Sequence, residues 1–204
     1  AVAAVKEGAK GGTAPTLAQL QKLGLKGLND GNLEQLQDAI AQTADDGSGV
    51  NTLAKLQGLL DTLNNAVASI SAAAEADSAK EGDPTAADYA NAGVRGVDAD
   101  NLAAINSALD TRGVNGLATD TPADIQKLVD AYQAILKAAD GTRGNAVKPT
   151  PEQYGLIGVT GIDANTPLTT RSLLGDVIDG KTRADVDTVP EVQALADAVA
   201  AVMR

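Results

Sequence analysis

The sequence predicts an all-α protein, made of tandem three-helix-bundle modules arranged as an elongated repeat array. A 26-residue stretch that begins at Pro84 recurs in weaker form at Pro15 and at Pro149. The aliphatic residues within each copy follow the three- and four-residue spacing of a helix face. The 204-residue chain holds three Tyr and neither Phe nor Trp, so its core is expected to consist of Ala, Leu, Val and Ile, which suit closely packed helices.

Each copy opens with a short predicted helix whose beginning has the same pattern. A threonine that caps a helix accepts a hydrogen bond from the backbone three residues later, where a polar side chain reaches back. The three pairs are Thr16 with Gln19, Thr85 with Asp88, and Thr150 with Gln153, the last with Pro151 at the first helical position. Glycine readily takes the left-handed conformation that ends a helix, and it follows at Gly24, Gly93 and Gly158.

A corner with two glycines comes next, as "GLKGL", "GVRGV" and "GVTGI". We expect a tight bend here, with the aliphatic residues closing the end of the bundle. Asn29, Asp98 and Asp163 then follow as predicted caps of the second helix. This helix is predicted to turn inward Leu33, Leu36 and Ile40 in the first copy and Leu102, Ile105 and Leu109 in the second. In the third copy Pro167 interrupts the pattern.

The third helix of each copy carries one apolar stripe with 3-4-3 spacing. The predicted stripes are Leu53, Leu56, Leu60 and Leu63; Ile125, Leu128, Tyr132 and Ile135; and Val192, Leu195, Val199 and Val202. Thr121 and Thr188 are the expected caps of the second and third of these helices. On this alignment the preceding loop varies in length, and seven extra residues lengthen the first of the long helices.

The two ends of the chain also match, because "AVAAVKEG" begins it and "AVAAVMR" ends it. We therefore expect residues 1–12 to be the tail of a preceding module, followed by helical modules at 13–82, 83–147 and 148–204. The chain starts without Met and is expected to be cut from a longer array. A unit of about 66 residues is close to the lower limit for an adequate core, so neighbouring modules are expected to support one another.

Charge and composition exclude several classes of function. The net charge is −11, and the basic residues are scattered along the chain, whereas nucleic-acid binding needs a concentrated cationic face. Neither a nucleic-acid partner nor membrane insertion is expected, and no apolar run reaches the length of a membrane span. The chain has no Cys and no His, which excludes disulfides, thiolate chemistry and every histidine-based site.

The candidate site residues are better explained by structure than by chemistry. Tyr89 and Tyr154 lie where the first copy has Leu20, and Tyr132 lies on the third-helix stripe, so all three are interpreted as core residues. Acidic pairs that calcium could use occur at Asp45 and Asp46, Asp98 and Asp100, and Asp185 and Asp187. None has the pattern of an EF-hand loop with its distal Glu, so we interpret them as caps and solvated loops. No catalytic, cofactor or metal residue is assigned, and an enzyme is not expected.

Two stretches carry a resemblance to known proteins: "PTAADYANAGVRGVDADNLAAIN" and "DTPADIQKLVDAYQAILKA". The chain resembles the helical tandem modules of very large bacterial surface and secreted adhesins. A weaker likeness is to the three-helix albumin-binding (GA-type) modules of Gram-positive surface proteins. The first resemblance implies an extracellular, cell-surface protein of bacterial origin, in which such modules act as stalk or spacer.

The expected function is therefore a structural spacer or stalk segment of a large extracellular adhesin, which extends an adhesive domain from the cell. Its expected partners are neighbouring modules of the same chain, and it is expected to be a monomer without cofactors. The alternative is a protein-binding module that recognises a host or matrix protein. It would do so through a helix face or the variable loops at 45–50, 112–120 and 180–187.

Overall fold

The computed structural model describes residues 1–75, 82–144 and 147–203 of the chain. The described residues form ten α-helices, three 3-10 turns and no strand, which confirms the all-α prediction. The helices are α1 (Val2–Ala9), α2 (Leu17–Gln21), α3 (Leu33–Ala41), α4 (Leu53–Glu75), α5 (Ala86–Asn91), α6 (Leu102–Leu109), α7 (Pro122–Ala138), α8 (Pro151–Leu156), α9 (Leu168–Asp179) and α10 (Val189–Val202). The 3-10 turns are η1 (Ser48–Val50), η2 (Gly116–Thr119) and η3 (Arg183–Asp185).

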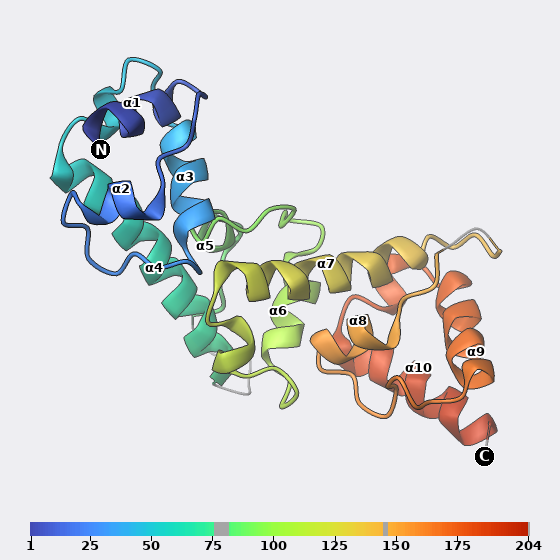
Figure 1. Cartoon of the computed structure of the whole chain (residues 1–204). Coiled ribbons are helices and arrows are strands. Elements are labelled where there is room, and N and C mark those ends of the chain that lie inside the picture. Colours follow the sequence, from blue (N-terminus) through green and yellow to red (C-terminus); the bar gives the residue numbers. More distant parts are fainter. Residues whose placement is uncertain (76–81, 145–146, 204) are drawn as a thin grey trace.

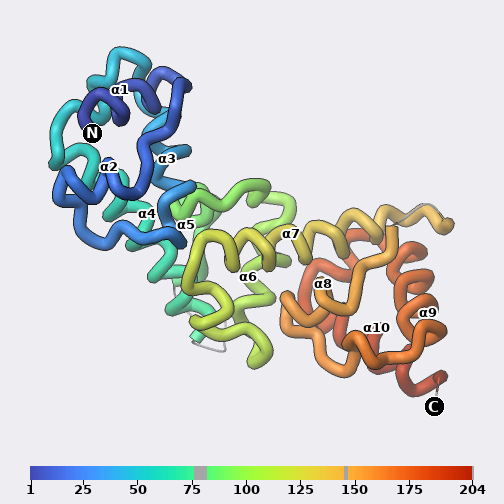
Figure 2. The backbone as a smooth tube through the Cα atoms, in the orientation of Figure 1, coloured from blue at the N-terminus to red at the C-terminus, as the bar shows by residue number. Residues whose placement is uncertain are grey.

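The helices follow one another along an elongated body with the two chain ends far apart (Figures 1 and 2). We name three units: the first unit (residues 15–50), the second unit (84–119) and the third unit (149–186). Each contains a short helix, a glycine corner, a second helix and a 3-10 turn. Helices α1, α4, α7 and α10 alternate with the units, so that every unit is held between two of these helices.

The short helices begin as their sequences predict. The threonine hydroxyls accept hydrogen bonds from the backbone N–H groups of Gln19, Asp88 and Gln153 at 3.3, 3.3 and 3.2 Å. Each of these three side chains accepts the threonine N–H in return, at 2.8 Å. The glycines that follow have φ values of +85° at Gly24, +74° at Gly93 and +88° at Gly158. Three capping boxes and three left-handed stops therefore confirm the predicted pattern.

The predicted caps of the second helix were wrong. Asn29, Asp98 and Asp163 accept hydrogen bonds from the backbone two residues later, at 2.8, 2.9 and 2.8 Å. They make tight turns of the Asx type ahead of the helix. Helices α3 and α6 begin after Asn32 and Asn101, and α9 begins after Pro167, whose φ of −51° suits the residue before a helix.

The predicted register between α4 and α7 was wrong by three residues. Leu53 is 51% exposed, whereas Leu56, Leu60 and Leu63 are buried. Leu56, not Leu53, is the counterpart of Ile125, because Pro15 precedes Leu56 by the same 41 residues that separate Pro84 from Ile125. The loops of the first two units are thus equal in length, and the stretch from Leu56 to Pro84 is four residues longer than that from Ile125 to Pro149, about one helical turn.

The buried apolar residues of the described chain form two clusters. The smaller comprises Val5, Ala9, Leu20, Leu36, Ile40, Val50, Leu56 and Leu60. The larger runs from Leu63 in α4 to Val199 in α10, and it includes the cores of both the second and third units. Helix α4 crosses from one cluster to the other, because Leu60 belongs to the first and Leu63 to the second.

Candidate functional site

A glutamine near the start of each long helix holds the glycine corner of its own unit. In the second unit, the Arg95 N–H donates to Gln126 Oε1 at 2.7 Å, and Gln126 Nε2 donates to the Arg95 carbonyl at 3.1 Å. Gln126 Nε2 also donates to Asp130 Oδ1 at 2.8 Å, which fixes the amide. Both backbone groups of the exposed corner residue are therefore satisfied by one side chain.

The same clamp occurs in all three units. Gln57 bonds both backbone groups of Lys26, at 2.9 and 3.0 Å, and Gln193 bonds those of Thr160, at 2.8 and 3.2 Å. The anchoring carboxylates are Asp61 and Asp197, four residues after each glutamine. Sequence reasoning missed this device, although the repeated spacing of glutamine and aspartate in the three long helices was a signal for it.

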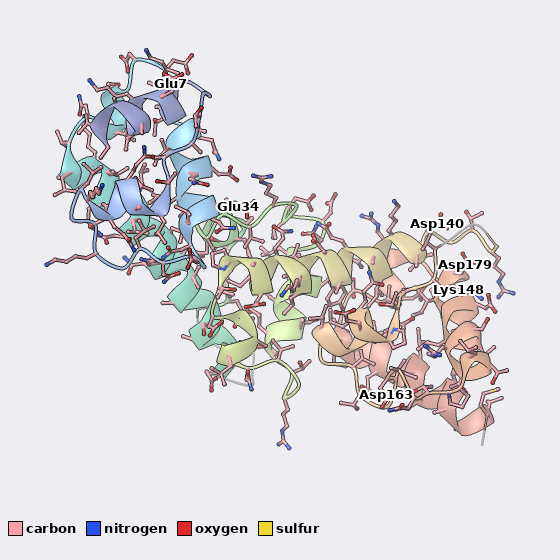
Figure 3. All side chains as sticks on the ribbon, viewed as in Figure 1. Glu7, Glu34, Asp140, Lys148, Asp163 and Asp179 are labelled. Carbon is pink, nitrogen blue, oxygen red and sulfur yellow. The ribbon has the colours of Figure 1, made fainter. Side chains whose placement is uncertain are left out.

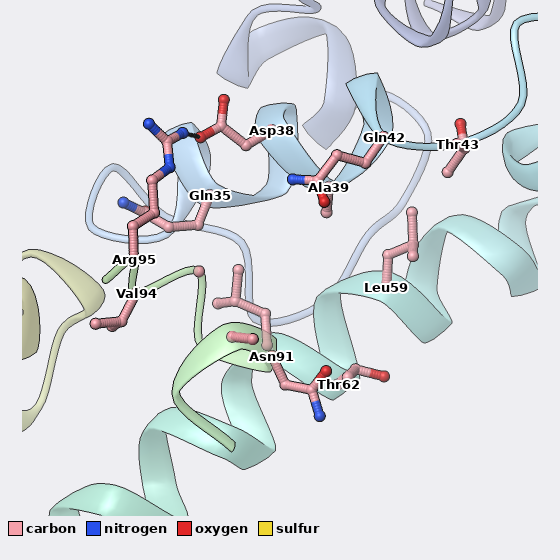
Figure 4. Close-up of a pocket in the computed structure, with 13 residues that line it drawn as sticks. Gln35, Asp38, Ala39, Gln42, Thr43, Leu59, Thr62, Asn91, Val94 and Arg95 are labelled. Carbon is pink, nitrogen blue, oxygen red and sulfur yellow. Dashed lines mark hydrogen bonds and ion pairs between the residues drawn. The ribbon is translucent and has the colours of Figure 1, made fainter. Parts of the chain in front are cut away.

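A pocket with a volume of about 460 Å³ lies at the first junction, between the first and second units (Figure 4). Side chains of α3, the middle of α4 and the corner after α5 line it. Asp38 and Arg95 form an ion pair on one side of it. Because the Arg95 side chain is 76% exposed and that of Asp38 is 40% exposed, this pair contributes little to stability.

The polar groups around this pocket are amides, hydroxyls and the Asp38–Arg95 pair. Gln35, Gln42 and Asn91 supply the amides, and Thr43 and Thr62 supply the hydroxyls. At this junction the backbone of Gly93 lies against the Gln35 side chain, so closely that a Cβ would be 2.5 Å from Gln35 Cγ. The arrangement joins α3 to the next corner through polar contacts and leaves an open groove beside them.

At the second junction, between the second and third units, two backbone segments are in direct contact. The backbone of Gly113 meets that of Gly158, where a Cβ on Gly113 would lie 2.8 Å from the Gly158 Cα. The Tyr132 hydroxyl donates to the Val186 carbonyl at 3.2 Å. The Val189 N–H donates to Ser107 Oγ at 3.0 Å, which ties the start of α10 to α6. Apolar packing continues through this junction, which explains why the second and third units share one cluster.

All three tyrosines lie in the core, as their repeat positions predict. Tyr89 and Tyr132 are fully buried and Tyr154 is 1% exposed, and burial raises the pKa of each phenol. The Tyr89 hydroxyl donates to Asn106 Oδ1 at 2.8 Å, and Asn106 Nδ2 donates to the Pro84 carbonyl at 2.9 Å.

The third unit lacks this arrangement. Arg171 stands at the position of Asn106, and the buried Tyr154 hydroxyl and Arg171 Nε have no hydrogen-bond partner among the described residues. An unpaired polar group in a core lowers stability.

One aspartate of each acidic pair serves a turn or a cap. Asp46 Oδ1 accepts the Ser48 N–H at 2.7 Å, and hydrogen bonds from Ser48 lower the pKa of Asp46. Asp98 Oδ1 accepts the N–H of Asp100. Asp185 Oδ2 accepts the N–H and the hydroxyl of Thr182, and these bonds lower its pKa. Asp45 is exposed.

Asp187 differs, because desolvation and the neighbouring Glu191 raise its pKa. Glu191 itself caps α10 by accepting the N–H and the hydroxyl of Thr188. Across the described ranges, no group of three or more acidic side chains gathers as a set of metal ligands.

The comparisons with known proteins add no relative. No protein-family model matches this chain, and neither a curated protein nor a solved structure matches it. None of the helices in the part of the chain that the structure describes is both long enough and apolar enough to cross a membrane. Function is therefore inferred from the geometry of the units and their junctions.

Proposed function

We propose that this chain is a spacer or stalk segment of a large extracellular bacterial adhesin, where it extends an adhesive domain from the cell surface. The proposed location is the one that the resemblance of its repeats to adhesin modules implies. The mechanical role is supported by one observation above all: α4 and α7 each pack against two successive units. A unit that shares a helix with its neighbour cannot turn freely against it.

The dimensions of the shared helices suit a spacer. Helix α4 has 23 residues and α7 has 17, which correspond to lengths of about 35 and 26 Å at 1.5 Å per residue. The units lie one after another along these helices (Figure 1). The reach of such a segment therefore grows with the number of units, while each unit needs only a small core of its own.

The surface charge fits a segment that works as a monomer beside identical neighbours. The chain has 27 acidic and 16 basic residues, and acidic side chains such as Glu7, Glu34 and Asp163 are distributed along the whole body (Figure 3). A net charge far from zero keeps protein chains apart in solution. The expected partners are thus neighbouring units of the same chain.

A proline at the crossing point of α4 tests this proposal. Asn65 is exposed on α4, two residues after Leu63, where the second cluster begins, and a proline there loses the bond to the carbonyl of Asp61, before the crossing. Asn65→Pro removes a helical hydrogen bond and kinks the helix, whereas Asn65→Ala preserves it. We expect the distance distribution between spin labels on the first and third units to be narrow in the native chain and in N65A, and broad in N65P.

Solution scattering on the same samples should show an extended particle for the native chain and N65A. A broad distance distribution in the native chain would contradict the proposal. So would a narrow one in N65P when circular dichroism shows that its helices remain.

The alternative function, protein binding through the variable loops, is favoured by one observation. Leu117 on η2 is 78% exposed, although its neighbours Gly116 and Thr119 are buried. Ser71 Oγ of α4 donates to the Gly116 carbonyl at 2.9 Å, and Glu75 Oε1 accepts the Gly116 N–H at 2.7 Å. A rigid loop with one exposed leucine can act as an anchor. Capture of a single serum or matrix protein, lost in Leu117→Ser, would favour this function over the spacer.

A further inference from the structure

The last turn of α10 leaves uncovered a face that α4 and α7 bury. The clamp glutamines align these helices, and the ninth residue after each of them is Ala66, Ile135 or Val202. Ala66 and Ile135 are buried, with 7% and 0% exposure. Val202 is 78% exposed and the following Met203 is 42% exposed. The predicted apolar stripe of this helix, which placed Val202 in the core, was therefore wrong at this residue.

Helix α1 shows what covers such a face. Residues 1–5 and 198–202 have the same sequence, AVAAV, so that Val5 corresponds to Val202 and Val2 to Val199. Val5 is 2% exposed and belongs to the cluster of the first unit, and α1 packs against α3 and η1. Val2 is 56% exposed, whereas Val199 is 4% exposed. In the AVAAV segment of α1 the second valine is buried and the first is exposed, whereas in that of α10 the first valine is buried and the second is exposed.

The groove that holds α1 is not completely filled by it. Beside Val2 and Val5, a hollow of about 130 Å³ is lined mainly by Leu23, Val50 and Leu56. The side chain of Lys6 lies over Gly47, whose Cβ position is 3.2 Å from Lys6 Cγ. Met203 is the counterpart of Lys6 and can make the same contact with its own apolar stem.

We propose that, where a second copy of the first unit follows α10 in one chain, the last turn of α10 takes the place of residues 1–5 in its α3–η1 groove, in the register that superposes Val202 on Val5. The two copies then share one long helix, as successive units within the chain share α4 and α7. The partner is a repeat unit of this same type, recognised by apolar packing along one helix face.

A head-to-tail fusion of two copies tests the register. Residue 202 of one copy is followed directly by residue 6 of the next, so that one AVAAV segment serves both. The matched control has two alanines inserted at the join, which rotates the two halves of the helix by about 200° relative to each other. We expect the amides of residues 199–202 to exchange hydrogen roughly tenfold to a hundredfold more slowly in the direct fusion than in the single chain, the factor for burying a valine.

Val202→Asp separates docking from simple continuation of a helix. In the direct fusion, V202D should restore the fast exchange, whereas in the single chain, where the side chain is exposed, it should change neither exchange nor unfolding. Equal slowing in the fusion with two extra alanines, or no effect of V202D in the direct fusion, would overturn the proposal. This inference concerns how units join, so its failure leaves the N65P test of the spacer function unaffected.

Discussion

The two junctions of this chain connect similar units in different ways. At the first junction, Gly93 lies against Gln35 at the beginning of α3, and a polar groove remains open. At the second, Gly158 lies against Thr111, just after α6 ends. Thr111 corresponds to Gln42 of the first unit, so the contact points differ by seven residues, or two helical turns. The repeated sequence thus determines the internal structure of each unit but not how neighbouring units pack against each other.

Two local differences account for this. From the clamp glutamine to the proline that opens the next unit there are 27 residues at the first junction and 23 at the second. Helix α4 also extends 18 residues past its clamp glutamine, whereas α7 extends 12 past its own. In addition, the second junction has Gly113 and Tyr132 where the first has Ala44 and Leu63. Backbone contact needs the glycine, and the tyrosine adds the hydrogen bond to the Val186 carbonyl.

The largest effect is expected from Tyr132→Ala, because this fully buried side chain lies in the cluster that the second and third units share. Its removal should lower the free energy of unfolding of that cluster by about 3–5 kcal/mol. Denaturant titration measures this loss, and amide exchange in α3 should stay unchanged because the first unit has its own cluster.

Tyr132→Phe is the matched control. It removes only the hydroxyl that donates to the Val186 carbonyl, and it should cost about 0.5–1.5 kcal/mol. A loss below about 1 kcal/mol in Y132A, or equal destabilisation of α3, would mean that the two junctions do not differ as described.

A smaller effect is expected from Gly113→Ala, which gives the second junction the residue of the first. The new Cβ would lie 2.8 Å from the Gly158 Cα, a backbone atom that cannot rotate away. Separating the two surfaces should cost about 1–3 kcal/mol and increase the distance between spin labels on the second and third units. Gly58→Ala in α4, where a Cβ would meet nothing within 4 Å, should instead stabilise by up to about 1 kcal/mol. Destabilisation by both would argue against a specific contact at Gly113.

Features that depend on residues close together in the sequence were predicted correctly, whereas features that depend on distant residues were not. The capping boxes and the glycine corners depend on residues three or four apart, and they were predicted residue by residue. The α4 register failed because Leu53, Leu56 and Leu60 allow two alignments one turn apart. The bond from Gln57 to Lys26, 31 residues earlier in the chain, distinguishes them in the structure.

The candidate site was less accessible to sequence reasoning than the fold. The first-junction pocket depends on the docking of α3 against the next corner, and Asp38 and Arg95 are 57 residues apart. No local spacing brings such residues together. The tyrosines, by contrast, were placed correctly because each occupies a repeat position that an aliphatic residue also fills.

A stabilising change of about 1 kcal/mol is expected from Arg171→Asn. In the second unit, Asn106 accepts from the Tyr89 hydroxyl and donates to the Pro84 carbonyl. Asparagine at position 171 can accept from Tyr154, whose buried hydroxyl has no hydrogen-bond partner in the part of the chain that the structure describes. Denaturant titration of R171N should show this gain, and it should disappear in R171N/Y154F. A gain that persists without the Tyr154 hydroxyl would refute the hydrogen-bond explanation.

The smallest effect concerns the caps of the two short helices that form the junctions. The Thr85 N–H donates to a carboxylate, Asp88, whereas the Thr150 N–H donates to an amide, Gln153, both at 2.8 Å. Hydrogen bonds from Thr85 lower the pKa of Asp88 below its ordinary value of 3.8. Its stabilising contribution is therefore present above that value and is lost as the pH falls through the lowered pKa.

Between pH 6 and pH 2, the amide resonance of Thr85 should titrate with Asp88, while that of Thr150 should stay nearly constant. Asp88→Gln should make α5 behave like α8, with a stability change of at most about 1 kcal/mol because the cap is exposed. If Thr150 titrates together with Thr85, the cause is acid loosening of the whole chain and not the charge of one cap. If only Thr85 titrates, acid weakens the helix at the first junction and leaves its counterpart at the second intact.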